Sequence, residues 1–294
     1  MKRARRFVEL LRTQPDYVFG RFLFVRRLYS VARRVAGPAM AASLKVGRIY
    51  ESDCNAVTVG PSGFVESAHP VDTHVARLHD TAWSNEICLT TAAVTALGDL
   101  AQTTRLMFQA SPERVEFAPS LDSLSPERRN GIALAQVADG WQDPTVAAIA
   151  GDEQIVAVVS KYLGYAPTRA SVFFFWSFAS ALSQEERIAR NQTVLFHYDV
   201  DGYNFVYVSF YLVDVDRDGG AHSLIERTHQ AKRLGHLLGT ARLSDEAAEA
   251  AFGRESIVTI EAPAGSGFFE DTSCYHKALV PTERDRLMIQ FRYQ

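Results

Sequence analysis

The stretch of residues 196–220, FHYDVDGYNFVYVSFYLVDVDRDGG, constrains the fold of this 294-residue chain more than any other. Residues 206–213 are rich in β-branched and aromatic side chains and predict a strand, and the Asp and Gly residues of 214–220 predict a turn after it. Near the start of the stretch, His197 and Asp199 stand two positions apart. Because successive side chains of a strand alternate between its faces, an extended chain points both to the same side. The stretch therefore predicts a strand that carries an imidazole and a carboxylate, two ligands of a metal site.

The C-terminal part of the chain supplies the groups that would complete such a site. Residues 257–262 and 287–291 read as strands, and His276 and Arg286 lie between them. Two histidines and one carboxylate that leave coordination positions open are the ligand set of non-haem Fe(II) oxygenases. An arginine at the start of a neighbouring strand suits a carboxylate ligand, which its planar guanidinium binds through two parallel hydrogen bonds. The sequence thus favours an iron site with an anion-binding arginine close to it.

Several segments, taken together in their order and spacing, resemble the phytanoyl-CoA dioxygenase-like family of Fe(II)- and 2-oxoglutarate-dependent oxygenases. They fall between about residue 150 and residue 294, roughly half of the chain. The segments are YLGYAP (162–167), FHYD (196–199), FYLVDVDRDGGAH (210–222), PAGSGFFEDTSCYHKALVP (263–281) and RLMIQFRY (286–293).

The resemblance implies a role for each matching residue. His197, Asp199 and His276 would bind Fe(II), and Arg286 would hold the distal carboxylate of the cosubstrate 2-oxoglutarate. With dioxygen as the third participant, the implied reaction is hydroxylation of a small-molecule substrate with release of succinate and CO2. In halogenating relatives a small residue replaces the carboxylate ligand, so that Asp199 favours hydroxylation or a related desaturation or ring reaction over halogenation.

One loop departs from the family pattern. Similar members show Gly-Ser-His after the Asp-Gly turn, whereas this chain has Arg227-Thr228-His229. Two other functions also stay open from the residues alone. The chain could be a non-catalytic jelly-roll binding protein, or a metal-dependent cupin-like hydrolase or isomerase, although the second leaves Arg286 without a role.

Short strands with helices gathered before them predict an α+β fold with a mainly β core: a double-stranded β-helix (jelly-roll or cupin-like barrel) with a helical N-terminal layer. Apolar periodicity predicts helices over 89–107 and 151–163, the second closed by Gly164. A further helix is expected over 244–252, with Ser244 as its N-cap. Residues 112–131 read as a charged loop.

The N-terminal segment is strongly basic. Residues 1–34 hold ten Lys or Arg and two acids, a net charge of +8, so that the rest of the chain carries −11. We expect residues 1–38 to form a basic helical segment, with helices over 2–12 and 17–36, before a single catalytic domain of residues 39–294. In the second helix one apolar face is formed by Val18, Phe22, Val25, Tyr29, Ala32 and Ala36. Arg21, Arg26 and Arg33 flank this face, and Arg27 and Arg34 lie opposite it. Such a basic amphipathic helix can lie on an anionic membrane or bind an acidic partner through residues 1–36, or pack its apolar face on the domain, which is the commoner case.

Composition bounds the remaining possibilities. A hydrophobic fraction of 47% and a charged fraction of 22% are those of an ordinary soluble globular protein. Three scattered cysteines predict no disulfide framework and favour a reducing, cytoplasmic location. We find no secretory signal, no apolar stretch of the roughly 18 residues that a membrane span requires, and no nucleic-acid-binding motif.

Overall fold

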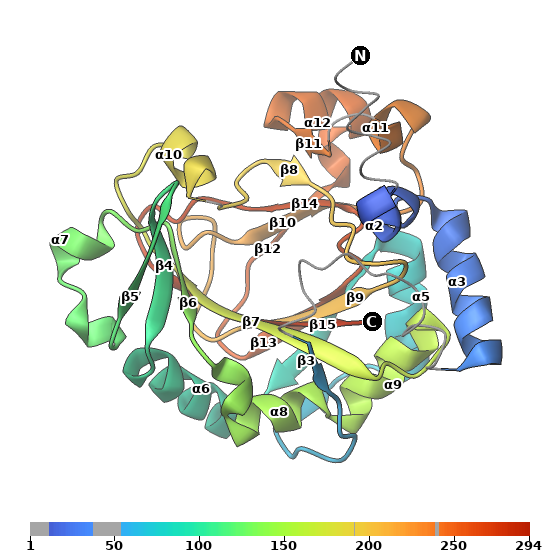
Figure 1. The fold of residues 1–294 in the computed structure, drawn as a ribbon, viewed down its shortest axis with the longest axis horizontal. Helices are drawn as coiled ribbons and strands as arrows, with labels where there is room; N and C mark the ends of the chain where they lie inside the picture. Colours follow the sequence, from blue (N-terminus) through green and yellow to red (C-terminus); the bar gives the residue numbers. More distant parts are fainter. Residues whose placement is uncertain (1–11, 38–53, 191, 239–240) are drawn as a thin grey trace.

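The computed structural model describes residues 12–37, 54–190, 192–238 and 241–294. Two antiparallel sheets face each other and form a double-stranded β-helix, which confirms the predicted fold class (Figure 1). The larger sheet has ten strands, in the order β2 (Val65–Ser67), β3 (Trp83–Leu89), β13 (Ser266–Glu270), β9 (Val206–Tyr211), β15 (Arg286–Tyr293), β7 (Arg169–Ser177), β6 (Leu134–Val137), β4 (Leu106–Ser111) and β5 (Arg114–Ala118), with β1 (Cys54–Ala56) paired to β7. The smaller sheet has five, in the order β11 (Arg242–Leu243), β8 (Phe196–His197), β14 (Tyr275–Ala278), β10 (His222–Ile225) and β12 (Ile257–Ile260).

Helices cover the outside of the larger sheet (Figure 1). Among the described residues the α-helices of the whole fold are α2 (Pro15–Phe19), α3 (Leu23–Ala36), α5 (Val71–Thr81), α6 (Thr91–Thr103), α7 (Pro126–Arg129), α8 (Pro144–Ala150), α9 (Glu153–Leu163), α10 (Gln184–Ala189), α11 (Leu234–Leu238) and α12 (Asp245–Phe252), of which α11 and α12 lie beside the smaller sheet instead (Figure 1). Buried side chains of α6, α8 and α9 join those of β7, β9 and β15 in the largest apolar cluster. In such a cluster, truncation of one large aliphatic side chain to Ala costs about 2–5 kcal/mol. Among the described residues, no helix combines the length and the apolar character needed to cross a bilayer.

Most predicted elements are present. Helix α9 ends at Gly164, which is left-handed with φ of 83°, and Ser244 caps α12 by accepting a hydrogen bond from the Ala247 amide. The predicted loop over 112–131 is wrong in part, because it contains strand β5, which pairs with β4 as a hairpin. The expected helix over 2–12 lies almost wholly outside the described residues.

The expected helix over 17–36 is broken at its start. Helix α2 ends at Phe19 and α3 begins at Leu23, because Phe22 between them adopts an extended conformation, with φ of −98° and ψ of 119°. Gly20, beside the break, packs closely against the backbone of residue 202. A Cβ on Gly20 would lie 2.3 Å from the carbonyl oxygen of Gly202. The chain therefore turns at this point, and α3 runs along one side of the molecule, at the right edge of Figure 1.

Candidate active site

The two predicted histidine ligands lie on neighbouring strands of the smaller sheet. His197 ends β8, His276 is on β14, and the two residues are direct cross-strand partners. The strand predicted to carry both His197 and Asp199 is shorter than expected, since β8 ends at His197. The Asp199 amide nevertheless donates a hydrogen bond of 2.8 Å to the Thr272 carbonyl, which holds the residue beside the loop before β14. All three side chains face one pocket.

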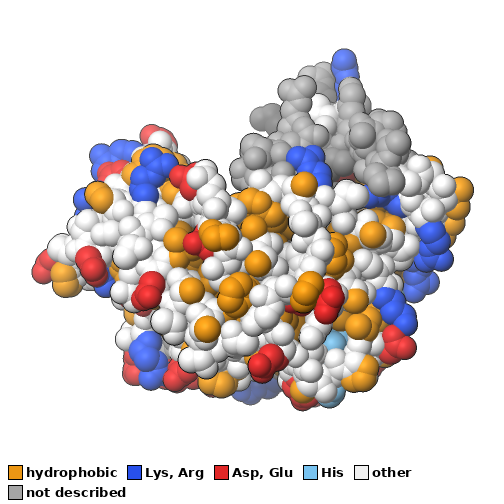
Figure 2. Space-filling model, turned by 90° about the horizontal axis from the view of Figure 1, so that it is seen from below, with side chains coloured by type: hydrophobic (Ala, Val, Ile, Leu, Met, Phe, Trp, Pro, Cys, Tyr) orange, Lys and Arg blue, Asp and Glu red, His pale blue; other side chains and the backbone are white. Residues whose placement is uncertain are grey.

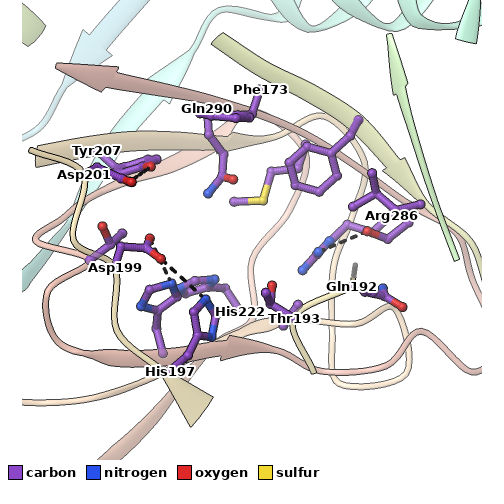
Figure 3. Close-up of a pocket in the computed structure, with 17 residues that line it drawn as sticks. Phe173, Gln192, Thr193, His197, Asp199, Asp201, Tyr207, His222, Arg286 and Gln290 are labelled. Carbon is purple, nitrogen blue, oxygen red and sulfur yellow. Dashed lines mark hydrogen bonds and ion pairs between the residues drawn. The ribbon is translucent and has the colours of Figure 1, made fainter. Parts of the chain in front are cut away.

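The three side chains converge on one point, as Figure 3 shows for His197 and Asp199. His197 Nε2 lies 3.7 Å from one carboxylate oxygen of Asp199, and His276 Nε2 lies 3.5 Å from the other. The centroids of the two imidazole rings are 4.3 Å apart. One ligand atom from each residue lies within 4.8 Å of the others, so that a single metal ion can contact all three.

Backbone carbonyl groups fix the orientation of both imidazoles. His197 Nδ1 lies 3.0 Å from the Leu195 carbonyl oxygen, and His276 Nδ1 lies 3.1 Å from that of Cys274. A carbonyl can only accept, so each Nδ1 carries the proton and each Nε2 keeps its lone pair for the pocket. This outer-shell arrangement is the one that metal-binding histidines use. The donor set and its orientation thus fit a divalent metal ion of the iron type.

Charges in the pocket favour a bound cation. Burial, together with the neighbouring His276, lowers the pKa of His197 to about 4, and burial lowers the pKa of His276 as well. Both imidazoles are therefore neutral at pH 7 and available as ligands. Burial and then the nearby Asp201 raise the pKa of Asp199 to about 7. A bound cation would remove the cause of that rise, because it supplies the positive charge that the carboxylate lacks.

Arg286 lies across the pocket from the three ligands (Figure 3). It opens β15, is 3% exposed, and donates hydrogen bonds to the Gly220 carbonyl and, at 3.2 Å, to Ser177 Oγ. Its Nε has no hydrogen-bond partner, and within the described part of the chain no carboxylate forms an ion pair with it. Burial lowers its pKa from the usual value. A buried guanidinium without an anion is suited to the carboxylate of a ligand.

The pocket has a volume of about 220 Å³ and runs from Arg286 past the three ligands to a polar end. At the polar end, Tyr207 donates a 2.5 Å hydrogen bond to Asp201, which also lies 3.6 Å from Arg292. Gln290 lines the wall between the two ends (Figure 3). The remaining lining side chains are Leu134, Phe173, Phe175, Ser177, Gln192, Thr193, His222, Thr272, Ala278 and Met288.

Two buried acids support the ligands from behind the pocket wall. Burial opposes the ionisation of Glu270, but His222 and His276 lower its pKa overall, and His222 Nε2 lies 2.9 Å from its carboxylate. Burial likewise opposes the ionisation of Asp271, but the Arg26 guanidinium, 2.9 Å away, holds the pKa of that carboxyl well below its usual range. Asp271 thus has a guanidinium partner within the protein, whereas the basic neighbours of Asp199 are imidazoles.

A second group of potential ligands consists of Glu270, Cys274 and His276, whose ligand atoms also lie within 4.8 Å of one another. Neither Glu270 nor Cys274 lines the pocket. The Cys274 thiol donates a hydrogen bond to the carboxylate of Glu270. Burial raises the pKa of the Cys274 thiol well above its usual value, which opposes formation of the thiolate that binds metals. Of the two groups, the one with Asp199 is therefore the candidate metal site.

Sequence reasoning missed several residues that line or support the site. His222 begins β10, lines the pocket and stacks on His276 with ring centroids 5.5 Å apart. Asp201 could have been found, because it continues the alternation of His197 and Asp199. No sequence signal marked Tyr207, which lies on β9.

Other candidates lie away from the pocket. Tyr198 points away from it, as alternation predicts, and donates a hydrogen bond to the His236 carbonyl. Arg284 pairs with Asp216 at the surface, as expected for a solvated residue in the turn before β15. In the loop that departs from the family pattern, Arg227 adopts a φ of 64°, a conformation that glycine reaches with less strain.

Solved structures with similar folds include enzymes that use iron and a 2-oxo acid. The epimerase SnoN from nogalamycin biosynthesis, in complex with Fe3+, alpha ketoglutarate and nogalamycin RO, is 16% identical over 76% of this chain and 83% of its own, with a TM-score of 0.50. EctD from S. alaskensis with bound Fe is 15% identical over 83% and 85%, with a TM-score of 0.49. HygX from Streptomyces hygroscopicus, with nickel, 2-oxoglutarate and hygromycin B, is 14% identical over 75% and 86%, with a TM-score of 0.45.

No protein-family model matches the chain. No curated protein matches it either. At an identity of 16%, the similarity to SnoN shows that the two proteins share a fold.

Proposed function

We propose that this chain is an Fe(II)- and 2-oxoglutarate-dependent oxygenase of the phytanoyl-CoA dioxygenase-like type. One observation carries the proposal: a single pocket contains a carboxylate without a cation, Asp199, and opposite it a guanidinium without an anion, Arg286. A metal ion that binds one end of a dicarboxylate, whose other end meets the arginine, would satisfy both. The same ligand types occur together in SnoN, whose structure contains Fe3+ and alpha ketoglutarate.

His197, Asp199 and His276 would hold the metal, and Arg286 would hold the distal carboxylate of 2-oxoglutarate. When bound, Fe(II) supplies the activation of dioxygen that couples decarboxylation of the 2-oxo acid to oxidation of a substrate. His197, Asp199 and His276 would supply three ligands, and a set of this kind leaves coordination positions for a cosubstrate. Ser177 and the Gly220 carbonyl orient Arg286 before the cosubstrate arrives, since both already accept its hydrogen bonds.

The substrate would lie at the polar end of the pocket, which is the part that the cosubstrate leaves free. Asp201, Tyr207 and Gln290 offer hydrogen-bonding groups there, and Phe173 offers an apolar wall. This composition suits a small molecule with hydroxyl or amino groups. Other proteins of this fold have been solved with small polar ligands, among them hygromycin B in HygX. Hydroxylation with release of succinate and CO2 is the reaction we expect.

Spectroscopy tests the proposal without knowledge of the substrate. Anaerobic addition of Fe(II) and 2-oxoglutarate should produce a weak visible charge-transfer band, and admission of air should yield succinate. Asp199→Ala should lose both signals. A band without succinate would favour the non-catalytic binding protein, and metal binding unaffected by 2-oxoglutarate would favour the hydrolase or isomerase.

A further inference from the structure

Helix α3 buries two of its four arginines and turns an apolar stripe outward. Arg26 and Arg33 are each 4% exposed, whereas the four stripe residues are 57–84% exposed. The stripe consists of Phe24, Leu28, Val31 and Val35. Their spacing of four, three and four residues aligns them along one side of the helix.

The burial of Arg26 holds the helix in this orientation. Its guanidinium donates to the carboxylate of Asp271, to the side chain of Asn204 and to the carbonyl of Phe205. Arg33 lies over the Tyr165 ring, 4.8 Å from its centroid. Rotating α3 to bury the stripe would break a buried ion pair, at a cost that the apolar contacts would have to exceed. The outward stripe is thus a fixed surface of the folded protein.

Charge on this side of the molecule is positive. Residues 12–37 contain six arginines and one acid, Asp16, which is buried. Arg27 and Arg34 are exposed and lie along one flank of the stripe. Figure 2 shows hydrophobic and basic side chains together along the right edge of the molecule, the edge on which Figure 1 places α3. An apolar stripe with a basic flank is the surface that interfacial helices present to anionic lipids.

A second copy of the chain fits this surface less well. A two-fold symmetric contact through the stripe would bring Arg27 and Arg34 of both copies to the same interface, where like charges repel. A phospholipid surface has no such conflict, because the long arginine side chains can reach the phosphate groups while the apolar residues enter the acyl boundary.

From these observations we propose that the outer face of α3 binds the surface of an anionic phospholipid bilayer, with Phe24, Leu28, Val31 and Val35 inserted and Arg27 and Arg34 at the headgroups. The protein would then act at a membrane surface, beside substrates that are dissolved in or presented by it. This binding does not depend on the metal site, and it would persist in a protein without turnover.

Vesicle cosedimentation of the full chain tests the proposal. The protein should bind vesicles of phosphatidylcholine with phosphatidylserine and bind pure phosphatidylcholine much more weakly. Leu28→Ser with Val31→Ser should lower the partition coefficient by about tenfold or more, because two exposed apolar contacts are lost without a change of charge. Arg27→Gln with Arg34→Gln should abolish the preference for phosphatidylserine.

Val115→Ser with Phe117→Ser is the matched control, since these residues of β5 are 49% and 51% exposed on the opposite side of the molecule in Figure 1. The control pair should bind as the wild type does, and circular dichroism should show that all variants are folded. The proposal is overturned if the wild type does not bind, or if the Leu28 and Val31 pair binds unchanged. It is also overturned if sedimentation equilibrium shows a dimer that this pair dissociates, which would identify a second copy as the partner.

Discussion

Two charged groups of the pocket wall, Asp199 and Arg286, differ from the ion pair directly behind it. Behind the wall, the carboxylate of Asp271 pairs with the Arg26 guanidinium. In the wall, Asp199 lies beside the neutral imidazoles of His197 and His276 and near the carboxylate of Asp201, and Arg286 has no carboxylate among the described residues. Charges that stabilise a fold are compensated within the chain, whereas charges that await a ligand are not. The difference therefore separates supporting residues from ligand-binding ones in the absence of any bound group.

The largest effect should come from the unpaired carboxylate. Asp199→Ala should abolish Fe(II) binding and reduce succinate formation by more than about 100-fold, because even the partners that orient metal ligands contribute 10- to 100-fold. Isothermal titration with Fe(II) under anaerobic conditions and a succinate assay measure both. Turnover at the wild-type rate would contradict the assignment of this ligand.

Loss of the ion pair between Asp271 and Arg26 should lower the stability of the folded protein. Arg26→Met leaves Asp271 buried and charged without its ion-pair partner, and should lower the free energy of unfolding by about 3–5 kcal/mol. Urea unfolding measures the change. Arg26→Met combined with Asp271→Leu should regain much of the loss, since it removes both charges, and a double variant no more stable than the single one would contradict this account.

Arg286→Met sharpens the comparison with Arg26→Met, because it removes a buried guanidinium that forms no ion pair with a described carboxylate. Without 2-oxoglutarate the variant should be as stable as the wild type or more so, since no ion pair is lost. Its KM for 2-oxoglutarate should rise by about tenfold or more, because the cosubstrate loses a pair of charge-assisted hydrogen bonds that contribute to its binding free energy. The affinity for Fe(II) should stay unchanged. An unchanged KM for 2-oxoglutarate would contradict the assignment of Arg286 as the residue that binds the cosubstrate.

The smallest effect concerns pH. The pKa of Asp271 is lowered in the folded state from an unfolded value of about 3.8, so that its contribution to stability is present above that pH and is lost as the pH falls below it. The difference in unfolding free energy between wild type and Asp271→Asn should therefore be largest at neutral pH and shrink below pH 3.8. Urea midpoints at pH 7, 5 and 3.5 test the sign, and a difference that grows on acidification would contradict it.

Local patterns predicted those parts of the protein that depend on local physics. Alternation placed His197 and Asp199 on one side, and Gly164 and Ser244 marked the ends of two helices as expected. The meeting of His276 with His197 depends on strand pairing across the barrel, which only the resemblance to a family suggested. The spacing of Val25, Tyr29 and Ala32 predicted the side of α3 that faces inward, where Tyr29 packs against the core, but not the burial of Arg26 and Arg33 beside it.

The burial of Arg26 and Arg33 in α3 has a long-range cause. The helix is oriented by Asp271, which is 245 residues from Arg26 in the sequence. A buried acid that pairs with arginine can outweigh an apolar stripe, and no local pattern of residues 23–36 indicates that such a partner exists. Sequence reasoning therefore assigned Arg26 and Arg33 to the flank of the helix, whereas both are buried.

The cross-strand pairing of His197 and His276 has a mechanical consequence. Strand β8 has only two residues, and its His197 faces β14 in the ladder. An ion bound by both imidazoles would cross-link this short strand to its neighbour. Loading the ion would thus slow amide hydrogen exchange along β8 and β14, so that the stiffness of the smaller sheet would report whether the site is filled.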